Sequence, residues 1–211
     1  MILNDYMNKY FTNLELRPPL FYNWNISIRF ELGVEHDSDD AYENIPYIQG
    51  VYQRAIALFN SLHSINDEIY LVVDVNDHTN GIKSKPKIFN RYIKNKSLLY
   101  RLKQKTIPYV FPEDDEEGIY TTNRFTLKCK KSDLNYITLL KAICNQDMGI
   151  KPSVFHRVYF INSNRKTIFH VYDDRGCDLL ATSPETIRKI YEKYNDWILD
   201  YDRSEIDKIF K

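Results

Sequence analysis

The stretch from 170 to 178 holds the densest group of side chains that could do chemistry. Its residues are His170, Val171, Tyr172, Asp173, Asp174, Arg175, Gly176, Cys177 and Asp178. On a strand, His170, Tyr172 and Asp174 would share one face, where a His, a Tyr and a carboxylate could support general acid–base catalysis. Cys177 could be a nucleophile if His170 or His156 lay within hydrogen-bond reach.

Turn formation explains the same stretch and is the favoured interpretation. Asp173 and Asp174 can accept hydrogen bonds from their own backbone, and Gly176 can supply a positive φ. Arg175 would then lie at the tip of the turn or pair with a neighbour. The sequence has no H-E-x-x-H, Walker, G-x-S-x-G or Rossmann pattern. It therefore favours a protein that is not an enzyme, and its only catalytic candidates are His170, Asp173, Asp174 and Cys177.

Metal and cofactor chemistry is not indicated. The 5 His and 3 Cys never occur in pairs spaced as zinc ligands. Asp37-Ser38-Asp39-Asp40 lacks the glycine and the terminal glutamate of a calcium-binding EF-hand loop. We expect no metal and no cofactor.

The charges are separated into blocks along the chain. Lys and Arg number 29, as do Asp and Glu, so the net charge is zero. Nine basic residues lie between Lys83 and Lys105, with no acidic residue between Asp77 and Glu113. Such a run could neutralise phosphates, and Phe89, Tyr92 and Tyr100 could stack on bases. The nucleic-acid candidates are Lys83, Lys85, Lys87, Arg91, Lys94 and Arg101. A solvated helix face is the favoured alternative.

Two acidic blocks could bind a basic protein partner, such as a toxin domain. The partner-binding candidates are Glu35, Asp37, Asp39, Asp40, Glu113, Asp114, Asp115, Glu116 and Glu117. Both blocks also have the composition of polar loops, and this alternative is favoured. The 17 Tyr residues could supply contact area for such a partner.

Hydrophobic patterning predicts the elements that must position these groups. We expect strands over 24–33, 68–75, 107–111, 120–130, 154–161, 167–172 and 177–181, the second of them central and covered on both faces. We expect helices over 1–14, 46–62, 88–105, 133–145 and 184–198. This order predicts one α+β domain over 1–211, with a mixed, mostly antiparallel sheet and helices packed on it.

The compartment also follows from the sequence. The first residues lack a basic segment followed by an apolar run, so we expect no secretory signal. The longest apolar run, residues 69–73, is too short to cross a membrane. Three cysteines are an odd number, without a disulfide framework. We therefore expect a cytoplasmic protein with no membrane partner.

Several segments resemble a family of bacterial domains of unknown function, found mostly in Gram-positive bacteria. These segments are RPPLFYNW at 17–24, IRFELG at 28–33 and FHVYDDRGCDLLATSPET at 169–186. The resemblance implies a single domain and a cytosolic bacterial protein, and it transfers no catalytic residue. By analogy of size and compartment, some small α+β proteins of such bacteria resemble immunity proteins, which bind and neutralise secreted toxins.

Three hypotheses follow. The first is a non-enzymatic cytosolic protein-binding domain, of the immunity or antitoxin type. The second is a nucleic-acid-binding protein that uses residues 83–105. The third is an enzyme that uses the cluster at 170–178.

Overall fold

The computed structural model describes residues 1–35, 45–78 and 86–211. The candidates Asp37, Asp39, Asp40, Lys83 and Lys85 lie outside the described residues. The other candidates can be placed.

One sheet of seven strands runs through the structure. The strands are β1 (Ser27–Glu31), β2 (Glu68–His78), β3 (Lys103–Pro108), β4 (Tyr120–Lys130), β5 (Arg157–Asn162), β6 (Thr167–Val171) and β7 (Gly176–Ala181). Their order is β1-β7-β6-β5-β2-β4-β3, and every pairing among the described strands is antiparallel. The predicted α+β class, with a mostly antiparallel sheet, is confirmed.

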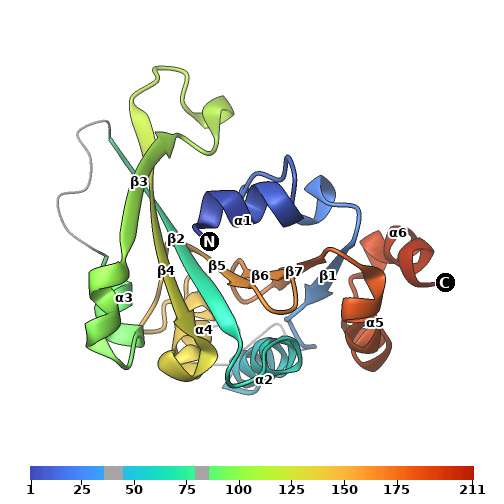
Figure 1. The fold of residues 1–211 in the computed structure, drawn as a ribbon. Coiled ribbons are helices and arrows are strands. Elements are labelled where there is room, and N and C mark those ends of the chain that lie inside the picture. The colour runs from blue at the N-terminus through green and yellow to red at the C-terminus, as the bar shows by residue number, and fades with distance from the viewer. Residues whose placement is uncertain (36–44, 79–85) are drawn as a thin grey trace.

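Helices lie against both faces of this sheet (Figure 1). They are α1 (Leu3–Tyr10), α2 (Ile45–Leu62), α3 (Lys87–Tyr92), α4 (Tyr136–Cys144), α5 (Pro184–Lys193) and α6 (Asp200–Phe210). Figure 1 shows α2 and α4 on one side of the sheet and α1 on the other. Each face of the sheet therefore has its own apolar layer.

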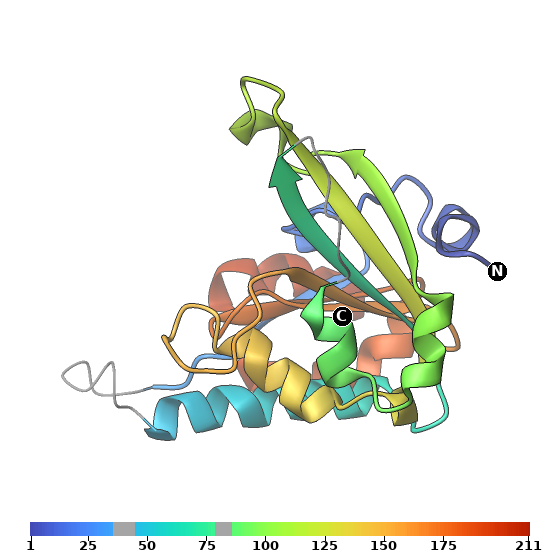
Figure 2. The same cartoon turned by 90° about the vertical axis from the view of Figure 1, so that its left-hand side faces the viewer.

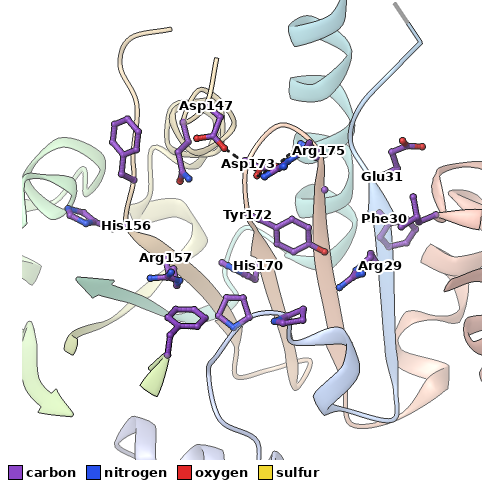
Figure 3. Close-up of a pocket in the computed structure, with 17 residues that line it drawn as sticks. Arg29, Phe30, Glu31, Asp147, His156, Arg157, His170, Tyr172, Asp173 and Arg175 are labelled. Carbon is purple, nitrogen blue, oxygen red and sulfur yellow. Dashed lines mark hydrogen bonds and ion pairs between the residues drawn. The ribbon is translucent and has the colours of Figure 1, made fainter. Parts of the chain in front are cut away.

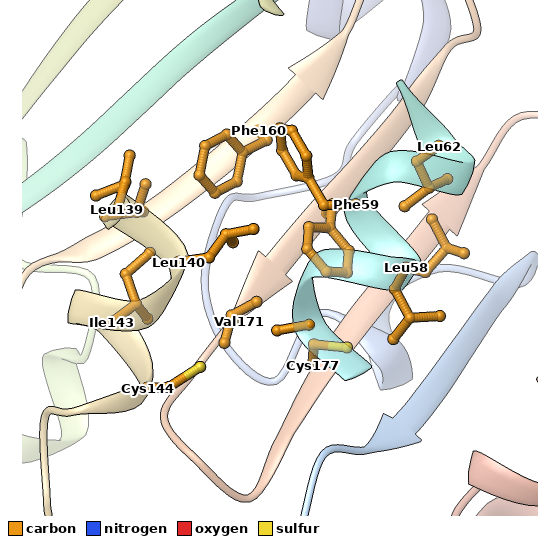
Figure 4. Packing of buried hydrophobic residues seen from close by; sticks show 14 of the residues in the cluster. Leu58, Phe59, Leu62, Leu139, Leu140, Ile143, Cys144, Phe160, Val171 and Cys177 are labelled. Carbon is orange, nitrogen blue, oxygen red and sulfur yellow. The ribbon is translucent and has the colours of Figure 1, made fainter. Parts of the chain in front are cut away.

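The strand β2 shows why both faces are apolar. Its residues from Ile69 to Val75 are all buried, as the continuous apolar run predicts. Ile69, Leu71 and Val73 belong to the larger core under α2 and α4, part of which Figure 4 shows. Tyr70 and Val72 belong to a second cluster, formed with α1 and the segment that follows it. The predicted central, doubly covered strand is thus confirmed.

The long strands β2 and β4 carry one end of the sheet away from the main body (Figure 2). β5 pairs with β2 only from Ile69 to Asp74, whereas β4 pairs with it as far as His78. The outer strand β3 covers β4 from Lys103 to Pro108. This end of the sheet therefore has an open edge.

The predicted helix over 88–105 is wrong. The helix α3 ends at Tyr92, and a 3-10 turn, η3, runs from Lys96 to Arg101. Ile93 is extended and bridges to Leu134, while Asn95 caps η3 by accepting a hydrogen bond from the Ser97 N–H. The rest of the segment is the edge strand β3, which ends at Pro108, so the predicted strand over 107–111 is misplaced.

The predicted terminal helix over 184–198 is also divided. α5 ends at Lys193, a short 3-10 turn, η6, follows at Asn195–Trp197, and α6 begins at Asp200. Ile198 forms an isolated bridge with Phe30 of β1, which the helix could not do if it continued. The break brings Asp202 of α6 toward the sheet.

Candidate functional site

A cleft of about 710 Å³ opens at one end of the sheet (Figure 3). Its floor is the sheet face that α1 covers further along. Its lining residues are Pro18, Pro19, Arg29, Phe30, Glu31, Phe111, Gln146, Asp147, Phe155, His156, Arg157, His170, Tyr172, Asp173, Arg175, Gly176 and Leu199. Two of these, His170 and Asp173, are catalytic candidates from the sequence.

A change from apolar to polar side chains on one sheet face creates this floor. The second apolar cluster includes Tyr159, Ile161, Ile168 and Leu180 from three adjacent strands. Because side chains alternate across a strand, residues two positions further along these strands lie on the same face. Those residues are polar. Cross-strand pairing places Asp74 between Arg124 and Arg157, and Asp178 between His170 and Arg29. Charged residues and His170 therefore stand on this face of six adjacent strands.

Asp178 is the centre of the buried part of this group. Its carboxylate is fully buried and accepts hydrogen bonds from the Phe21 N–H at 3.1 Å and the Tyr172 hydroxyl at 2.5 Å. Arg29 Nε lies 3.4 Å from the same carboxylate. Burial raises the pKa of Tyr172, and the negative charge of Asp178 raises it further. The Tyr172 hydroxyl therefore stays protonated and donates its hydrogen bond.

Arg29 is held by several neighbouring groups. Its Nη1 donates to the Asp202 carboxylate at 3.2 Å and to the Tyr22 hydroxyl at 3.1 Å. The guanidinium lies 4.7 Å from the centre of the Tyr22 ring and 5.2 Å from that of Phe21. We call Arg29, Tyr172, Asp178 and Asp202 the paired half of the site, because their charges and donors satisfy one another.

Arg157 lies on the other side of the cleft from Arg29, with His170 and Tyr172 between them (Figure 3). Its guanidinium lies 4.2 Å from the centre of the Phe111 ring. It forms no ion pair or side-chain hydrogen bond with any residue that the structure describes. We call Phe111, Phe155, His156 and Arg157 the open half of the site.

His170 closes the floor between the two halves. Its Nδ1 lies 2.9 Å from the Val158 carbonyl, and its ring stacks on Tyr159 at 4.5 Å. Burial lowers the pKa of His170, and it also lowers the pKa of His156. Near neutral pH both rings are therefore uncharged, which leaves Arg157 as the cation of the open half.

The condition under which Cys177 could be a nucleophile, a hydrogen bond with His170, is not met. Cys177 is completely buried in the core on the opposite face of the sheet, as Figure 4 shows. Burial raises the pKa of its thiol well above the ordinary value, and the negative charge of Asp178 raises it further. A neutral thiol on the wrong face cannot be activated by His170.

The turn at 172–175 differs in part from the prediction. Asp173 accepts a hydrogen bond from the Arg175 N–H at 2.8 Å, and its other oxygen pairs with the Arg175 guanidinium. Asp174 points elsewhere and accepts a hydrogen bond from the Tyr47 hydroxyl at 2.7 Å. β6 ends at Val171, so the strand that would have placed all three residues on one face does not continue: His170 and Tyr172 both line the cleft, but Asp174 does not.

Gly176 is required for close packing, not for a positive φ. Among the described glycines, only Gly118 and Gly149 have positive φ. A Cβ on Gly176 would lie 3.0 Å from the Phe30 carbonyl oxygen and 3.0 Å from the Tyr172 ring. The prediction of a left-handed turn glycine is therefore wrong at this position.

The described acidic candidates lie away from the cleft floor. Glu35 is exposed, and Glu113 pairs with Arg17. Asp115 accepts hydrogen bonds from the N–H groups of Ile119 and Tyr120, which closes the turn before β4. Asp114, Glu116 and Glu117 are exposed near this turn and form no ion pair with a described residue.

The described basic candidates lie on the surface. Lys87 and Arg91 belong to α3, and Lys94 follows it. Arg101 ends η3, and all four side chains are exposed. Phe89 and Tyr92, proposed as stacking groups, are buried in the core, whereas Tyr100 is 74% exposed.

No group of three or more His, Cys, Asp or Glu side chains could hold a metal ion within 1–35, 45–78 and 86–211. In the same part of the chain, no helix has the length and apolar character needed to span a membrane.

The residues of the site that the sequence did not single out are Arg29, Asp178, Asp202 and Arg157. Arg29 stands on the polar face of its predicted strand, and Asp178 belongs to the cluster at 170–178. Their meeting depends on β1 pairing with β7, which no local pattern indicates. No sequence pattern pointed to Asp202 or Arg157. The position of Asp202 depends on the break after α5, and that of Arg157 depends on the β2–β5 register.

The fold and the cleft define an α+β protein with a charged, half-open site on a sheet face. The family model described as "Domain of unknown function (DUF3885)" matches residues 3–202, and the chain belongs to this family. The chain is also 36% identical over 211 residues to "Uncharacterized protein YnaE" of Bacillus subtilis (strain 168), covering 95% of this chain and 99% of that protein. No solved structure matches. The resemblance to a family from Gram-positive bacteria is confirmed.

Proposed function

We propose that this protein is a non-enzymatic binding protein that recognises a carboxylate-bearing segment of a partner protein in the cleft. The observation that carries the proposal is Arg157. It is a cation without an acidic partner among the described residues, held against the Phe111 ring in a cleft of about 710 Å³. A planar guanidinium with free donors matches the two oxygens of a carboxylate.

Recognition fits the cleft better than catalysis because Tyr172, Asp173 and His170 are already engaged within the fold. The Tyr172 hydroxyl donates to Asp178, and Asp173 is held by Arg175. The Nδ1 atom of His170 is within hydrogen-bond distance of a backbone carbonyl oxygen. A general acid or base must reach substrate with a free proton or lone pair, and each of these three groups already has a partner within the fold.

The composition of the open half favours a protein segment as the ligand. Phe155 is 61% exposed at the cleft, and the Phe111 ring lies under Arg157. Aromatic side chains and arginine are enriched where protein interfaces hold most of their binding energy. A carboxylate next to an apolar side chain would contact both Arg157 and these rings.

The test uses randomised pentapeptides that contain no Asp or Glu, in two matched sets, one with a free C-terminal carboxylate and one amidated. Both sets are screened against the wild-type protein, and the selected sequences are measured by titration calorimetry. We expect the free acids to bind at least tenfold more tightly than the amides, because charged hydrogen bonds contribute about 1.5–3 kcal/mol. Equal affinity of acids and amides would refute the proposal.

Arg157→Gln and Lys189→Gln form a matched pair for this measurement. Each removes one cation, and Lys189 is exposed on α5 without an ion pair to a described residue. Arg157→Gln should abolish the preference for free acids, and Lys189→Gln should retain it. Loss of binding in both variants would mean that the carboxylate is attracted by overall charge.

A second candidate is binding of a basic protein, such as a toxin domain, by the acidic turn before β4. The observation that favours it is that Asp114, Glu116 and Glu117 are exposed without a described ion-pair partner. An immunity-type role remains a proposal on this basis. Co-purification with the product of a neighbouring toxin gene, and its loss in a triple Asp/Glu→Lys variant, would support it.

We also propose a cytoplasmic location. Cys129, Cys144 and Cys177 are free and buried in the structure. Unpaired thiols persist in a reducing compartment. Cell fractionation with a tagged full-length protein tests this proposal, and recovery outside the cytoplasmic fraction would refute it.

A further inference from the structure

A second concave surface lies at the open edge of the sheet, apart from the cleft. It is a groove of about 590 Å³ between the start of α1 and the surface formed by η3, β3, β4 and β2. Its lining includes four basic side chains, which are Arg101, Lys103, Lys128 and Lys130. The groove shares no residue with the carboxylate cleft.

The groove has more positive charge than its acidic residues can neutralise. Lys128 pairs with Glu68 at 2.8 Å. The other acid, Asp133, accepts a hydrogen bond from the Lys130 backbone N–H. Arg101, Lys103 and Lys130 are exposed and form no ion pair with any described acid. Like charges gathered on one concave surface attract anionic molecules and raise their local concentration.

Two aromatic residues line this groove, and of these Tyr70 is buried whereas Tyr100 is 74% exposed. Arg101 Nε donates to the Tyr100 hydroxyl at 2.7 Å, and its guanidinium lies 5.2 Å from the ring centre. Lysines on an edge strand also prevent strand-to-strand aggregation. That role explains Lys103, but it does not explain an exposed aromatic ring fixed beside an arginine.

We propose that this groove binds single-stranded nucleic acid. Proteins that bind single strands combine a basic groove along the phosphates with aromatic rings on which bases stack. Arg101, Lys103 and Lys130 would contact successive phosphates, and Tyr100 would stack on a base. A single strand fits better than a duplex, because duplex bases are already stacked and cannot cover the Tyr100 ring.

Fluorescence anisotropy with labelled 15-nucleotide poly(dT), poly(U) and a 15-base-pair duplex tests the proposal on the full chain. Both single strands should bind at least fivefold more tightly than the duplex. With about three phosphates neutralised, log Kd should change with log salt with a slope of about 2. No saturable binding at about 50 mM salt, where phosphate contacts are strongest, would overturn the proposal. Equal binding of the duplex would also overturn it.

Charge-reversal pairs separate the groove from general electrostatics. Arg101→Glu with Lys103→Glu should weaken single-strand binding at least tenfold. The control, Lys189→Glu with Lys193→Glu, makes the same charge change on the exposed surface of α5 and should change Kd less than threefold. Equal losses in the two pairs would show that the groove is not the site.

Tyr100 distinguishes nucleic acid from any other polyanion, such as an acidic protein. Tyr100→Ala should weaken binding about fivefold or more, the range found when a stacking ring is removed. Tyr100→Phe, which keeps the ring, should bind within twofold of the wild type. Full affinity in Tyr100→Ala would leave charge as the sole attraction and overturn the proposal.

Discussion

The two arginines on either side of the cleft have opposite surroundings. Arg29 contacts Asp178, Asp202 and Tyr22, and its side chain is 16% exposed. Arg157 contacts the Phe111 ring and has no acidic partner among the described residues. A charge that is already neutralised stabilises the fold, whereas a charge left without a partner is available to a ligand. The paired half should therefore control stability and the open half should control recognition.

The largest expected effect is the loss of Asp178. Asp178→Ala leaves Arg29, the Tyr172 hydroxyl and the Phe21 N–H without their acceptor. Breaking a buried ion pair typically costs about 3–5 kcal/mol, and we expect that loss in urea unfolding. Asp114→Ala, an exposed carboxylate, should change the free energy of unfolding by less than about 0.5 kcal/mol. Equal small effects would show that the paired half is not structural.

The next effect is on the pH dependence of stability, and it comes from two buried histidines. His63 directly follows α2 and is buried, as is His170. Burial lowers the pKa of His63 to about 4, and it lowers the pKa of His170 as well. The unfolded chain binds these protons at a higher pH than the folded chain, so stability is full above about pH 6.5 and falls as the pH decreases. His63 alone should account for about 3 kcal/mol between pH 6.5 and pH 4.

Urea unfolding at pH 7, 5.5 and 4 measures this dependence. His63→Asn should reduce the difference between pH 7 and pH 4, because the titrating ring is gone. If His63→Asn had the same pH dependence of stability as the wild type, protonation of His63 would not be the cause of the loss at low pH.

A smaller effect is expected at Tyr172. Tyr172→Phe removes one charged hydrogen bond to Asp178 but keeps the ring that packs beside Gly176. We expect a loss of about 2 kcal/mol in the free energy of unfolding, within the range for hydrogen bonds to charged groups. A loss of less than about 0.5 kcal/mol would mean that Tyr172 contributes through its ring packing and not through its hydroxyl.

The smallest expected effect on stability is at Arg157. Arg157→Gln breaks no ion pair with a described residue, so unfolding should change by less than about 0.5 kcal/mol. Arg29→Gln is the matched control on the other side of the cleft, and it should destabilise the protein strongly. A reversal of this order would remove the distinction between the two halves.

Local patterns predicted most of the framework. The alternation around Phe30 and the apolar run after Glu68 gave strands close to the observed β1 and β2. Pro46 indicated where α2 begins, and the helix ends at the predicted Leu62. These features depend on neighbours in the chain, so they can be recognised without knowing which strands pair.

The site could be predicted only in part, because it depends on pairing between distant segments. The cluster at 170–178 drew attention to the correct turn, but the faces of its residues depended on where β6 ends. Arg157 reaches the cleft through the β2–β5 register, and Asp202 through the break after α5. Neither position is encoded in a short pattern. The interpretation of residues 88–105 as one helix failed for a similar reason, because Ile93 pairs with the distant Leu134.

The most direct test of the central claim follows the arginine side chains themselves. Nε–Hε signals of Arg157 and Arg29 are recorded by NMR while an N-acetylated peptide with a free C-terminal carboxylate, selected as above, is added. The account predicts a saturable shift at Arg157 with Arg29 nearly unchanged, and no Arg157 shift with the amidated peptide. A shift at Arg29 alone, or no shift at Arg157, would contradict it.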